Sequence, residues 1–348
     1  MMKLSHLCFA LLILVGGCQQ PHTVHRAFYY WKTAFSLSNT EKQALQQTAT
    51  QKLYVKFFDV LWNPVTTTAM PVAKVQINTT DLQWLQQHHI PVIPVVFITN
   101  ESLQQTPEEK ILTIADNLSQ LLSAQLEQYA LTTKEIQVDC DWTAGTRDKY
   151  FKLLRRLREQ PLLNNKQIIL SATIRLYQCK YRTKTGVPPV DRGLLMCYNM
   201  GNLKDPATKN SILETDELKK YIGSLNTYPL PLDAAFPLFD WKVLYRNNIY
   251  SGLIQTIPDD TLKRQPFVQV KGNRFFITTD TTWKGYMLNK GDILRSETSN
   301  LNEIIDAATA LRKKWQTQDF TVSLFHLDSL VLTKYPSYEL EKIFTVMQ

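Results

Sequence analysis

Short apolar runs of strand length alternate along the chain with longer segments whose apolar residues recur at helical spacing. The run 135–143 shows the strand pattern most clearly. Its residues Asp139, Asp141 and Thr143 fall on one face, whereas the even-numbered residues of the run, which are apolar, fall on the other. Amphipathic helical segments precede and follow this run, which indicates a buried parallel strand in an α/β fold rather than an exposed antiparallel strand.

Eight strand-like runs occur in the chain, and most of them are separated by a helical segment. They cover residues 27–31, 53–60, 92–99, 135–143, 167–175, 194–200, 232–239 and 320–327. This alternation predicts a (β/α)8 TIM barrel, whose functional groups lie at the carboxyl ends of the strands. The expected helices cover 80–89, 107–129, 146–159, 211–225, 301–315 and 338–346. The stretch 178–191 has no helical stripe, so we expect a loop that covers part of the barrel mouth.

The segment 248–295 has a different character from the rest. Its strand-like runs are short and are separated by Gly and Asn turns, which predicts a small β-rich insertion after strand seven. The barrel is then expected to comprise 26–247 and 296–348.

The first residues have the layout of a secretory signal peptide, with one lysine followed by the apolar run 7–15. The sequence around Cys18 resembles a bacterial lipobox. We therefore expect residues 1–17 to be a signal peptide, Cys18 to be the lipidated residue and 18–25 to be a short tether. Gln19 after the cysteine favours the outer membrane, by resemblance to enterobacterial sorting. The expected location is thus the bacterial cell envelope, with a membrane anchor through lipid.

The amino-acid composition and charge limit the kinds of binding partner that we expect for this protein. The chain has 348 residues, is 44% hydrophobic and carries a net charge of +8, so it can bury the core of one barrel-sized domain. Lysine and arginine are scattered rather than gathered, so we expect no nucleic-acid platform, although anionic envelope glycans remain compatible partners. Three cysteines follow Cys18, and none has metal-binding spacing. We expect neither a metal nor a cofactor.

Two acids on the inner face of one strand are the first candidates for chemistry. Asp139 and Asp141 would perturb each other's protonation, which suits proton transfer or the orientation of a substrate. The alternative is that they are hydrogen-bonded structural acids at a strand end. Arg175, on the inner face of strand five, could neutralise these acids, clamp an acidic substrate group or form a purely structural ion pair.

The run around these acids resembles the strand-four motif of family 18 glycoside hydrolases, the chitinases and their relatives, which reads D-x-x-D-x-D-x-E. Asp139 and Asp141 match its second and third acids, and Trp142 fits the aromatic residue that precedes the final glutamate. Ile136 replaces the first aspartate. Thr143 occupies the position of the catalytic glutamate, which is the general acid of that family.

A second resemblance lies on strand six. Residues 196–199 resemble the family's M-x-Y-D, with Asn199 in place of the aspartate, and Phe325 stands where the family has a stacking tryptophan in W-x-x-D. The resemblance implies that Asp141 orients the substrate's acetamide, that Asp139 tunes Asp141 and that Tyr198 assists catalysis. The expected substrate-binding residues are Tyr30, Glu101, Trp142, Thr143, Arg175, Met196, Asn199 and Phe325.

Three functions follow as hypotheses, and whether the protein is an enzyme stays open between them. The first is an envelope glycoside hydrolase that binds and cleaves a glycan containing N-acetylhexosamine, such as peptidoglycan. It needs a substitute proton donor, with Asp59, Glu101, Asp240 and Asp328 as candidates. The second is a non-catalytic glycan-binding or scaffold lipoprotein, because threonine replaces the catalytic glutamate. The third is hydrolysis by a different pair of acids on a substrate without an acetamide.

Overall fold

The computed structural model describes residues 23–348 except 165–166, 256 and 318. The expected signal peptide 1–17, Cys18 and most of the tether therefore lie outside the described residues. Across the described part of the chain, no helix combines the length and the apolar character that a membrane crossing requires.

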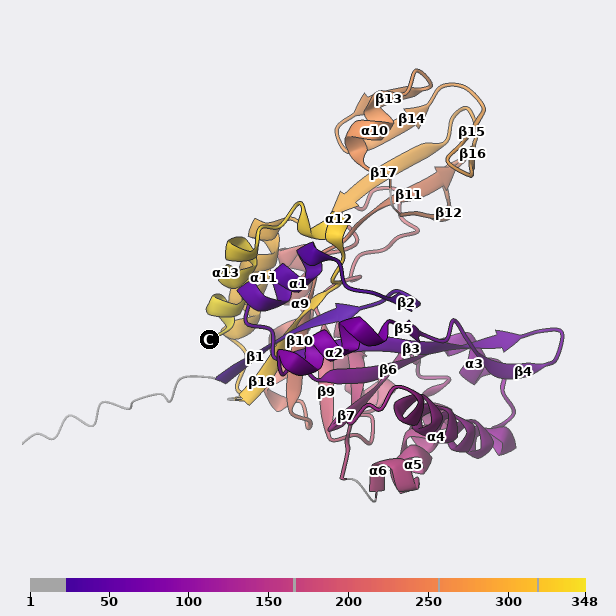
Figure 1. Cartoon of the computed structure of the whole chain (residues 1–348). Coiled ribbons are helices and arrows are strands. Elements are labelled where there is room, and N and C mark those ends of the chain that lie inside the picture. The colour runs from indigo at the N-terminus through magenta and orange to yellow at the C-terminus, as the bar shows by residue number, and fades with distance from the viewer. Residues whose placement is uncertain (1–22, 165–166, 256, 318) are drawn as a thin grey trace, which may run out of the picture.

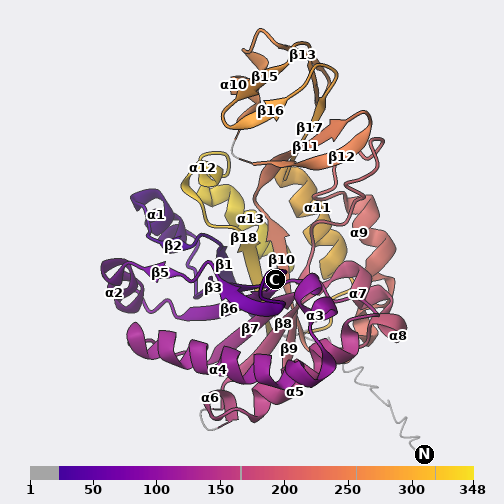
Figure 2. The ribbon, with the colours of Figure 1, turned by 90° about the vertical axis from the view of Figure 1, so that its right-hand side faces the viewer.

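Eight parallel strands form a closed barrel, as the sequence predicted (Figures 1 and 2). In order around the barrel they are β1 (Thr23–Tyr30), β3 (Lys52–Asn63), β6 (Val92–Ile98), β7 (Glu135–Cys140), β8 (Ile169–Arg175), β9 (Arg192–Met196), β10 (Leu232–Pro237) and β18 (Asp319–Phe325). Strand β1 pairs with both β18 and β3, which closes the ring. The carboxyl ends of all eight strands therefore meet at one mouth.

Helices surround the barrel in the expected alternation (Figure 2). The longer ones are α1 (Asn39–Gln47), α2 (Thr79–Gln87), α4 (Ile111–Gln128), α5 (Arg147–Glu159), α9 (Thr215–Tyr221), α11 (Leu301–Arg312) and α13 (Ser337–Met347). Short helical turns are α3 (Asn100–Gln105), η1 (Glu108–Lys110), α6 (Pro161–Asn164), η2 (Ile222–Thr227) and α12 (Ser329–Leu332). Helix α1 begins at a capping box, because Ser38 and Glu41 satisfy each other's backbone N–H groups.

The stretch 178–191 is not the plain loop that the sequence suggested. Helix α7 (Leu176–Lys180) follows β8 directly, and α8 (Arg182–Thr185) comes next. Gly186 ends α8 with a φ of 75°, and a Cβ there would lie 2.6 Å from the ring of Phe151. Both the backbone conformation and the space therefore require glycine, which fixes α8 against α5.

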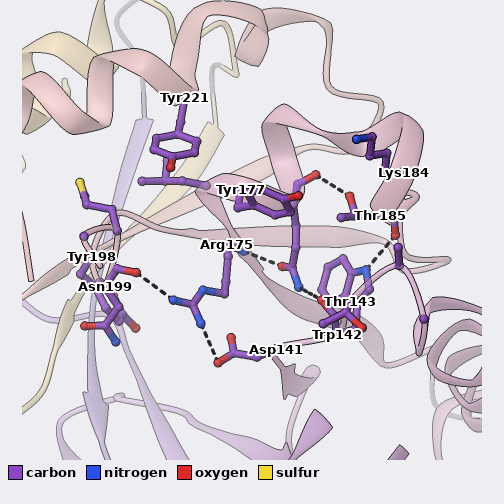
Figure 3. Close-up of a pocket in the computed structure, with 16 residues that line it drawn as sticks. Asp141, Trp142, Thr143, Arg175, Tyr177, Lys184, Thr185, Tyr198, Asn199 and Tyr221 are labelled. Atoms are coloured by element: carbon purple, nitrogen blue, oxygen red, sulfur yellow. Dashed lines mark hydrogen bonds and ion pairs between the residues drawn. The ribbon is translucent and has the colours of Figure 1, made fainter. Parts of the chain in front are cut away.

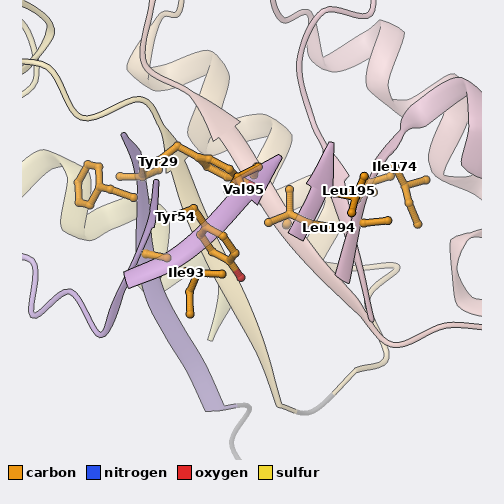
Figure 4. Packing of buried hydrophobic residues seen from close by; sticks show 14 of the residues in the cluster. Tyr29, Tyr54, Ile93, Val95, Ile174, Leu194 and Leu195 are labelled. Carbon is orange, nitrogen blue, oxygen red and sulfur yellow. The ribbon is translucent and has the colours of Figure 1, made fainter. Parts of the chain in front are cut away.

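The inside of the barrel is polar near its base and aromatic above. The carboxylate of Glu135 accepts hydrogen bonds from Ser171 Oγ at 2.6 Å and from the Tyr54 hydroxyl at 3.2 Å. The ring of Tyr29 stacks on that of Tyr54, with 4.8 Å between the centroids. Figure 4 shows part of this packing. Because these contacts join different strands across the interior, they fix which residues of β7 point inward.

The β-rich insertion is longer than the sequence indicated. Its five-stranded sheet consists of β11 (Asp240–Arg246), β12 (Ile249–Ile254), β13 (Val268–Lys271), β14 (Arg274–Ile277) and β17 (Ile293–Thr298), with a separate hairpin of β15 (Thr281–Trp283) and β16 (Tyr286–Leu288). The insertion thus begins at 240 and ends at 298. It carries the short helix α10 (Asp259–Lys263) and its own small apolar core, and it projects from the barrel (Figure 1).

Three further short strands lie beside the barrel at the mouth. Strand β4 (Thr68–Val72) pairs with β3 as an antiparallel hairpin, and β2 (Ala34–Phe35) pairs with β5 (Gln76–Ile77). The sequence did not predict these strands, because each of them is short and lies between longer elements.

Candidate functional site

A pocket of about 580 Å³ opens at the carboxyl ends of β7, β8 and β9 (Figure 3). The segments that follow these strands supply most of its wall, and α8 and α9 supply the rest. The lining residues are Asp141, Trp142, Thr143, Ala144, Gly145, Arg175, Leu176, Tyr177, Gln178, Lys184, Thr185, Tyr198, Asn199, Met200, Gly201 and Tyr221. The pocket therefore gathers six of the residues that the sequence predicted, which are Asp141, Trp142, Thr143, Arg175, Tyr198 and Asn199.

Arg175 connects the ends of three strands. Its Nη1 donates to Asp141 Oδ2 at 2.9 Å, and its Nη2 donates to the backbone oxygen of Asn199 at 2.8 Å. In Figure 3 the guanidinium lies between Asn199 on one side and Asp141 on the other. The side chain of Asp141 is 46% exposed, so this ion pair faces the pocket rather than the barrel interior. Of the alternatives that the sequence left open for Arg175, the structure shows the ion pair with Asp141.

Asp139 lies beneath this ion pair and does not line the pocket. Its Oδ1 accepts a hydrogen bond from Thr173 Oγ1 at 2.5 Å. Burial raises the pKa of Asp139 to about 7, and the negative charge of Asp141 acts in the same direction. The hydrogen bond from Thr173 and the charge of Arg175 oppose that rise in pKa. Asp139 can therefore hold a proton at neutral pH, whereas an ordinary aspartic acid cannot.

The raised pKa of Asp139 predicts a stability that falls as pH rises. Between about pH 4 and pH 7 the folded protein keeps a proton on this carboxyl that the unfolded chain has lost, so its contribution falls by up to about 1.4 kcal/mol per pH unit. Asp139→Asn lacks this titration. The free energy of unfolding of the variant, minus that of wild type, should therefore be larger at pH 8 than at pH 5 in urea titrations. An equal difference at both pH values would contradict the expectation.

Tyr198 closes the floor of the pocket. Its ring stacks on Phe325 with 5.4 Å between the centroids, and it meets the edge of Phe239 at 5.9 Å. Burial raises the pKa of Tyr198 well above its usual value, and the charges of Asp139 and Asp141 add to this effect. The phenol is therefore protonated and available as a hydrogen-bond donor. Phe325 lies under Tyr198 and does not line the pocket, so it supports the site instead of contacting a ligand there.

Thr143 lies on the exposed wall of the pocket, two residues beyond Asp141. Its backbone N–H donates to Thr146 Oγ1 at 3.0 Å, which fixes the turn that leads into α5. Trp142 borders the pocket, but the residue is only 2% exposed and its ring packs on Tyr150. Its Nε1 donates to the backbone oxygen of Thr185 at 2.8 Å. The indole thus holds α8 against the barrel and offers little surface for a sugar.

Three other expected binding residues lie away from the pocket. Tyr30 is 1% exposed, and its hydroxyl donates to the backbone oxygens of Ala34 and Ser36. Glu101 is exposed in the first turn of α3. Met196 packs partly buried against the barrel core. None of the three is among the lining residues.

None of the candidate substitute acids lines the pocket, and three of them are paired with a lysine. Asp59 pairs with Lys56 at 2.9 Å and Asp328 pairs with Lys32 at 2.7 Å. Asp240 contacts Lys334. Burial opposes ionisation of Asp328, yet the bond from Lys32 and two backbone N–H groups outweigh it and lower its pKa. Among the described residues that line the pocket, Asp141 is the only carboxylate.

The sequence did not identify the outer wall of the pocket. Tyr177 and Lys184 come from α7 and α8, and Tyr221 comes from α9. One signal for Tyr177 was available: it follows Arg175 by two residues, so it would lie on the same face of strand five. Nothing in the local sequence marks Tyr221, because only the closed barrel brings α9 beside α7.

No group of three or more histidine, cysteine or acidic side chains suited to a metal ion occurs in the described parts of the chain. Cys140, Cys179 and Cys197 are free and buried. The polar groups of the residues that line the pocket are carboxylate, guanidinium, amine, phenol, amide, hydroxyl and indole groups.

Solved structures with the same fold include a spore cortex-lytic enzyme, a chitinase and a chitinase-like agglutinin. The spore cortex-lytic enzyme SleL of Bacillus cereus has a TM-score of 0.57 at 14% identity, covering 94% of this chain and 75% of that one. A family 18 chitinase mutant from Cycas revoluta, in complex with (GlcNAc)4, has a TM-score of 0.54 at 13% identity, covering 93% and 99%. A chitinase-like agglutinin from Robinia pseudoacacia has 0.54 at 12% identity, covering 92% and 99%.

No family model and no curated protein sequence matches this chain. At identities this low, the structural likeness shows the fold, which is a TIM barrel like that of family 18 glycoside hydrolases. This agrees with the fold that the motifs on β7 and β9 predicted.

Proposed function

We propose that this barrel of chitinase-like fold binds a glycan containing N-acetylhexosamine in the pocket at the ends of β7, β8 and β9, and that it does so without cleaving the glycan. The observation that carries the proposal is Thr143. It lies on the pocket wall at the position where the resembling family has its general acid, and no other acid that lines the pocket replaces it. The chitinase-like fold supports glycan binding or hydrolysis as the broader class of function.

A threonine hydroxyl cannot replace a carboxylic acid here. It does not release a proton at neutral pH, and the loss of general acid catalysis typically slows a reaction by about 10²–10⁴-fold. Asp141 is present, but its Oδ2 is held by Arg175 at 2.9 Å. The remaining oxygen can still accept a hydrogen bond from an acetamide N–H. The site thus keeps groups that bind a sugar and lacks the group that protonates the leaving oxygen.

The neighbouring structures support both parts of the proposal. The Cycas revoluta chitinase mutant was solved in complex with (GlcNAc)4, and the Robinia pseudoacacia protein is described as a chitinase-like agglutinin. The same fold is therefore found in proteins described by catalysis and in one described by agglutination. We extend glycan binding from those proteins to this chain as part of the proposal.

The proposed location is the outer membrane of a bacterial envelope, through a lipid on Cys18. The support is the signal-like run 1–17 and the lipobox-like sequence before Cys18. Fractionation of cells that express the full chain or Cys18→Ser tests it, since the variant should leave the membrane fraction. Persistence of Cys18→Ser in that fraction would count against the anchor.

Tyr198→Phe tests the binding site with little change in packing. The ring keeps its contacts with Phe325 and Phe239, while the hydroxyl of this pocket-lining residue is lost. We expect affinity for the glycan to fall about three- to tenfold, the effect of one net hydrogen bond, with the melting temperature unchanged. Calorimetric titration with chitin oligosaccharides and peptidoglycan fragments measures it, with reducing-end release followed in parallel. Absence of binding by wild type to all these glycans would refute the proposed function.

A further inference from the structure

We infer, on the basis of the proposed function, that the pocket prefers oligosaccharides that carry an acidic substituent, and that Lys184 determines this specificity. The charged side chains among the lining residues are Asp141, Arg175 and Lys184. The first two form an ion pair at 2.9 Å and neutralise each other. The ammonium of Lys184 makes no ion pair with any described residue, and its side chain is exposed. The pocket thus presents one uncompensated positive charge.

The position of Lys184 is fixed by contacts on both sides of it. Thr185 Oγ1 donates to the backbone oxygen of Gln178 at 2.9 Å, and the backbone oxygen of Thr185 accepts from Trp142. Arg147 Nη1 donates to the backbone oxygen of Lys184 at 3.4 Å, and Arg147 is itself paired with Asp148. The backbone beneath Lys184 is therefore held in place. Figure 3 shows Lys184 on the opposite side of Arg175 from Tyr198 and Asn199.

Two tyrosines of the same wall suit the uncharged face of a sugar. Tyr177 is 52% exposed, and Tyr221 is half-buried beside it in the pocket lining. Behind them, the ammonium of Lys180 lies 5.2 Å from the ring centroids of both Tyr181 and Tyr221. A saccharide ring that packs on these aromatic faces places its substituents within the positive field of Lys180 and Lys184.

The acidic groups near this wall do not cancel that field. Glu217 contacts Tyr221, but its carboxylate is paired with Lys220 at 2.6 Å. Asp148 is paired with Arg147 at 2.8 Å. Because Glu217, Asp148 and Asp141 each have their own cation, a carboxylate on the ligand is the partner that Lys184 lacks. A neutral chitin oligosaccharide uses the tyrosines and leaves that charge unpaired.

The test compares ligands that differ by charge. The full chain in detergent micelles is titrated calorimetrically with (GlcNAc)4, with a tetrasaccharide of alternating N-acetylglucosamine and N-acetylmuramic acid, and with the methyl ester of that tetrasaccharide. A hyaluronan tetrasaccharide distinguishes a uronate from a lactyl carboxylate. We expect the free acids to bind at least about threefold more tightly than the ester and (GlcNAc)4, and this advantage to disappear at 0.5 M salt.

Lys184→Gln should remove the advantage, because it reduces affinity for the acidic ligands about three- to fivefold more than it reduces affinity for (GlcNAc)4. Lys313→Gln, at an exposed lysine beyond α11, is the matched control and should change neither. Equal affinity for acid, ester and (GlcNAc)4 would overturn the inference and leave the proposed function standing. Failure of wild type to bind any of the four ligands would overturn both.

Discussion

Thr143→Glu is expected to release reducing ends from (GlcNAc)4 at least about a hundredfold faster than wild type. The wild-type rate should not exceed the rate without protein, because no acid in the pocket protonates the leaving oxygen. A glutamate at 143 places a carboxyl on the exposed wall, two residues beyond Asp141. The gain corresponds to the lower end of what general acid catalysis contributes, about 10²–10⁴-fold.

The surroundings of position 143 can hold a longer side chain. Position 143 lies on the same pocket wall as Asp141, whose charge is paired with Arg175. Thr143 is exposed and lines the pocket. A longer side chain therefore has room to turn toward the pocket.

Two further variants separate the causes of inactivity. Thr143→Gln has the size of glutamate without its proton and should stay inactive. In Thr143→Glu/Arg175→Ala, Asp141 is also released from its ion pair with Arg175. If only this double variant cleaves, the ion pair is a second block on hydrolysis. If neither glutamate variant cleaves although both still bind the glycan, the prediction is wrong and the loss of the acid is not what makes the protein inactive.

Glu297→Ala is expected to lower the free energy of unfolding by about 3–5 kcal/mol, the cost of breaking a buried ion pair from one side. Glu297 and Arg295 are both fully buried, and Arg295 Nε donates to Glu297 Oε1 at 2.6 Å. Trp241 Nε1 donates to Glu297 Oε2 at 2.7 Å, and Ser211 Oγ donates to the same oxygen. Alanine leaves the Nε–H of Arg295, the indole N–H and the hydroxyl without this acceptor, although Arg295 Nη1 still donates to the backbone oxygen of Asp205.

This cluster joins the insertion to the pocket. Ser211 belongs to the chain that precedes α9, and its backbone oxygen accepts from Gly201 N at 3.1 Å. Asn199 N donates to the backbone oxygen of Ile212 at 2.8 Å. Gly201 and Asn199 both line the pocket. We therefore expect Glu297→Ala to weaken glycan binding as well as stability, although Glu297 lies outside the pocket.

Urea denaturation followed by circular dichroism measures the stability of this variant. Asp216→Ala is the matched control, since Asp216 is 91% exposed in its side chain and pairs with Lys219 at 2.9 Å. The control should change stability by less than about 0.5 kcal/mol. A loss for Glu297→Ala as small as that of the control would show that the buried pair contributes little to the fold.

The errors of the sequence interpretation have local causes. Helices α7 and α8 have five and four residues, which is too few for an apolar stripe to repeat, so the stretch 178–191 was interpreted as a loop. Tyr30 was expected at the site because the strand is rich in aromatics. The structure instead points Tyr29 into the barrel and Tyr30 toward the backbone of residues 34–36.

The sequence by itself determined the barrel and the order of its strands. It also determined that Asp139, Asp141 and Arg175 lie on the inner faces of their strands. These follow from the period of two along a strand and from the alternation of strands with amphipathic segments, which are properties of neighbouring residues. Only the tertiary structure decided that Arg175 bonds to Asp141 and to the backbone of Asn199, that Trp142 holds α8, and that Tyr221 and Tyr177 line the same pocket. Each of these contacts joins residues more than twenty positions apart, and a local pattern carries no information about which distant partner a side chain meets once the barrel closes.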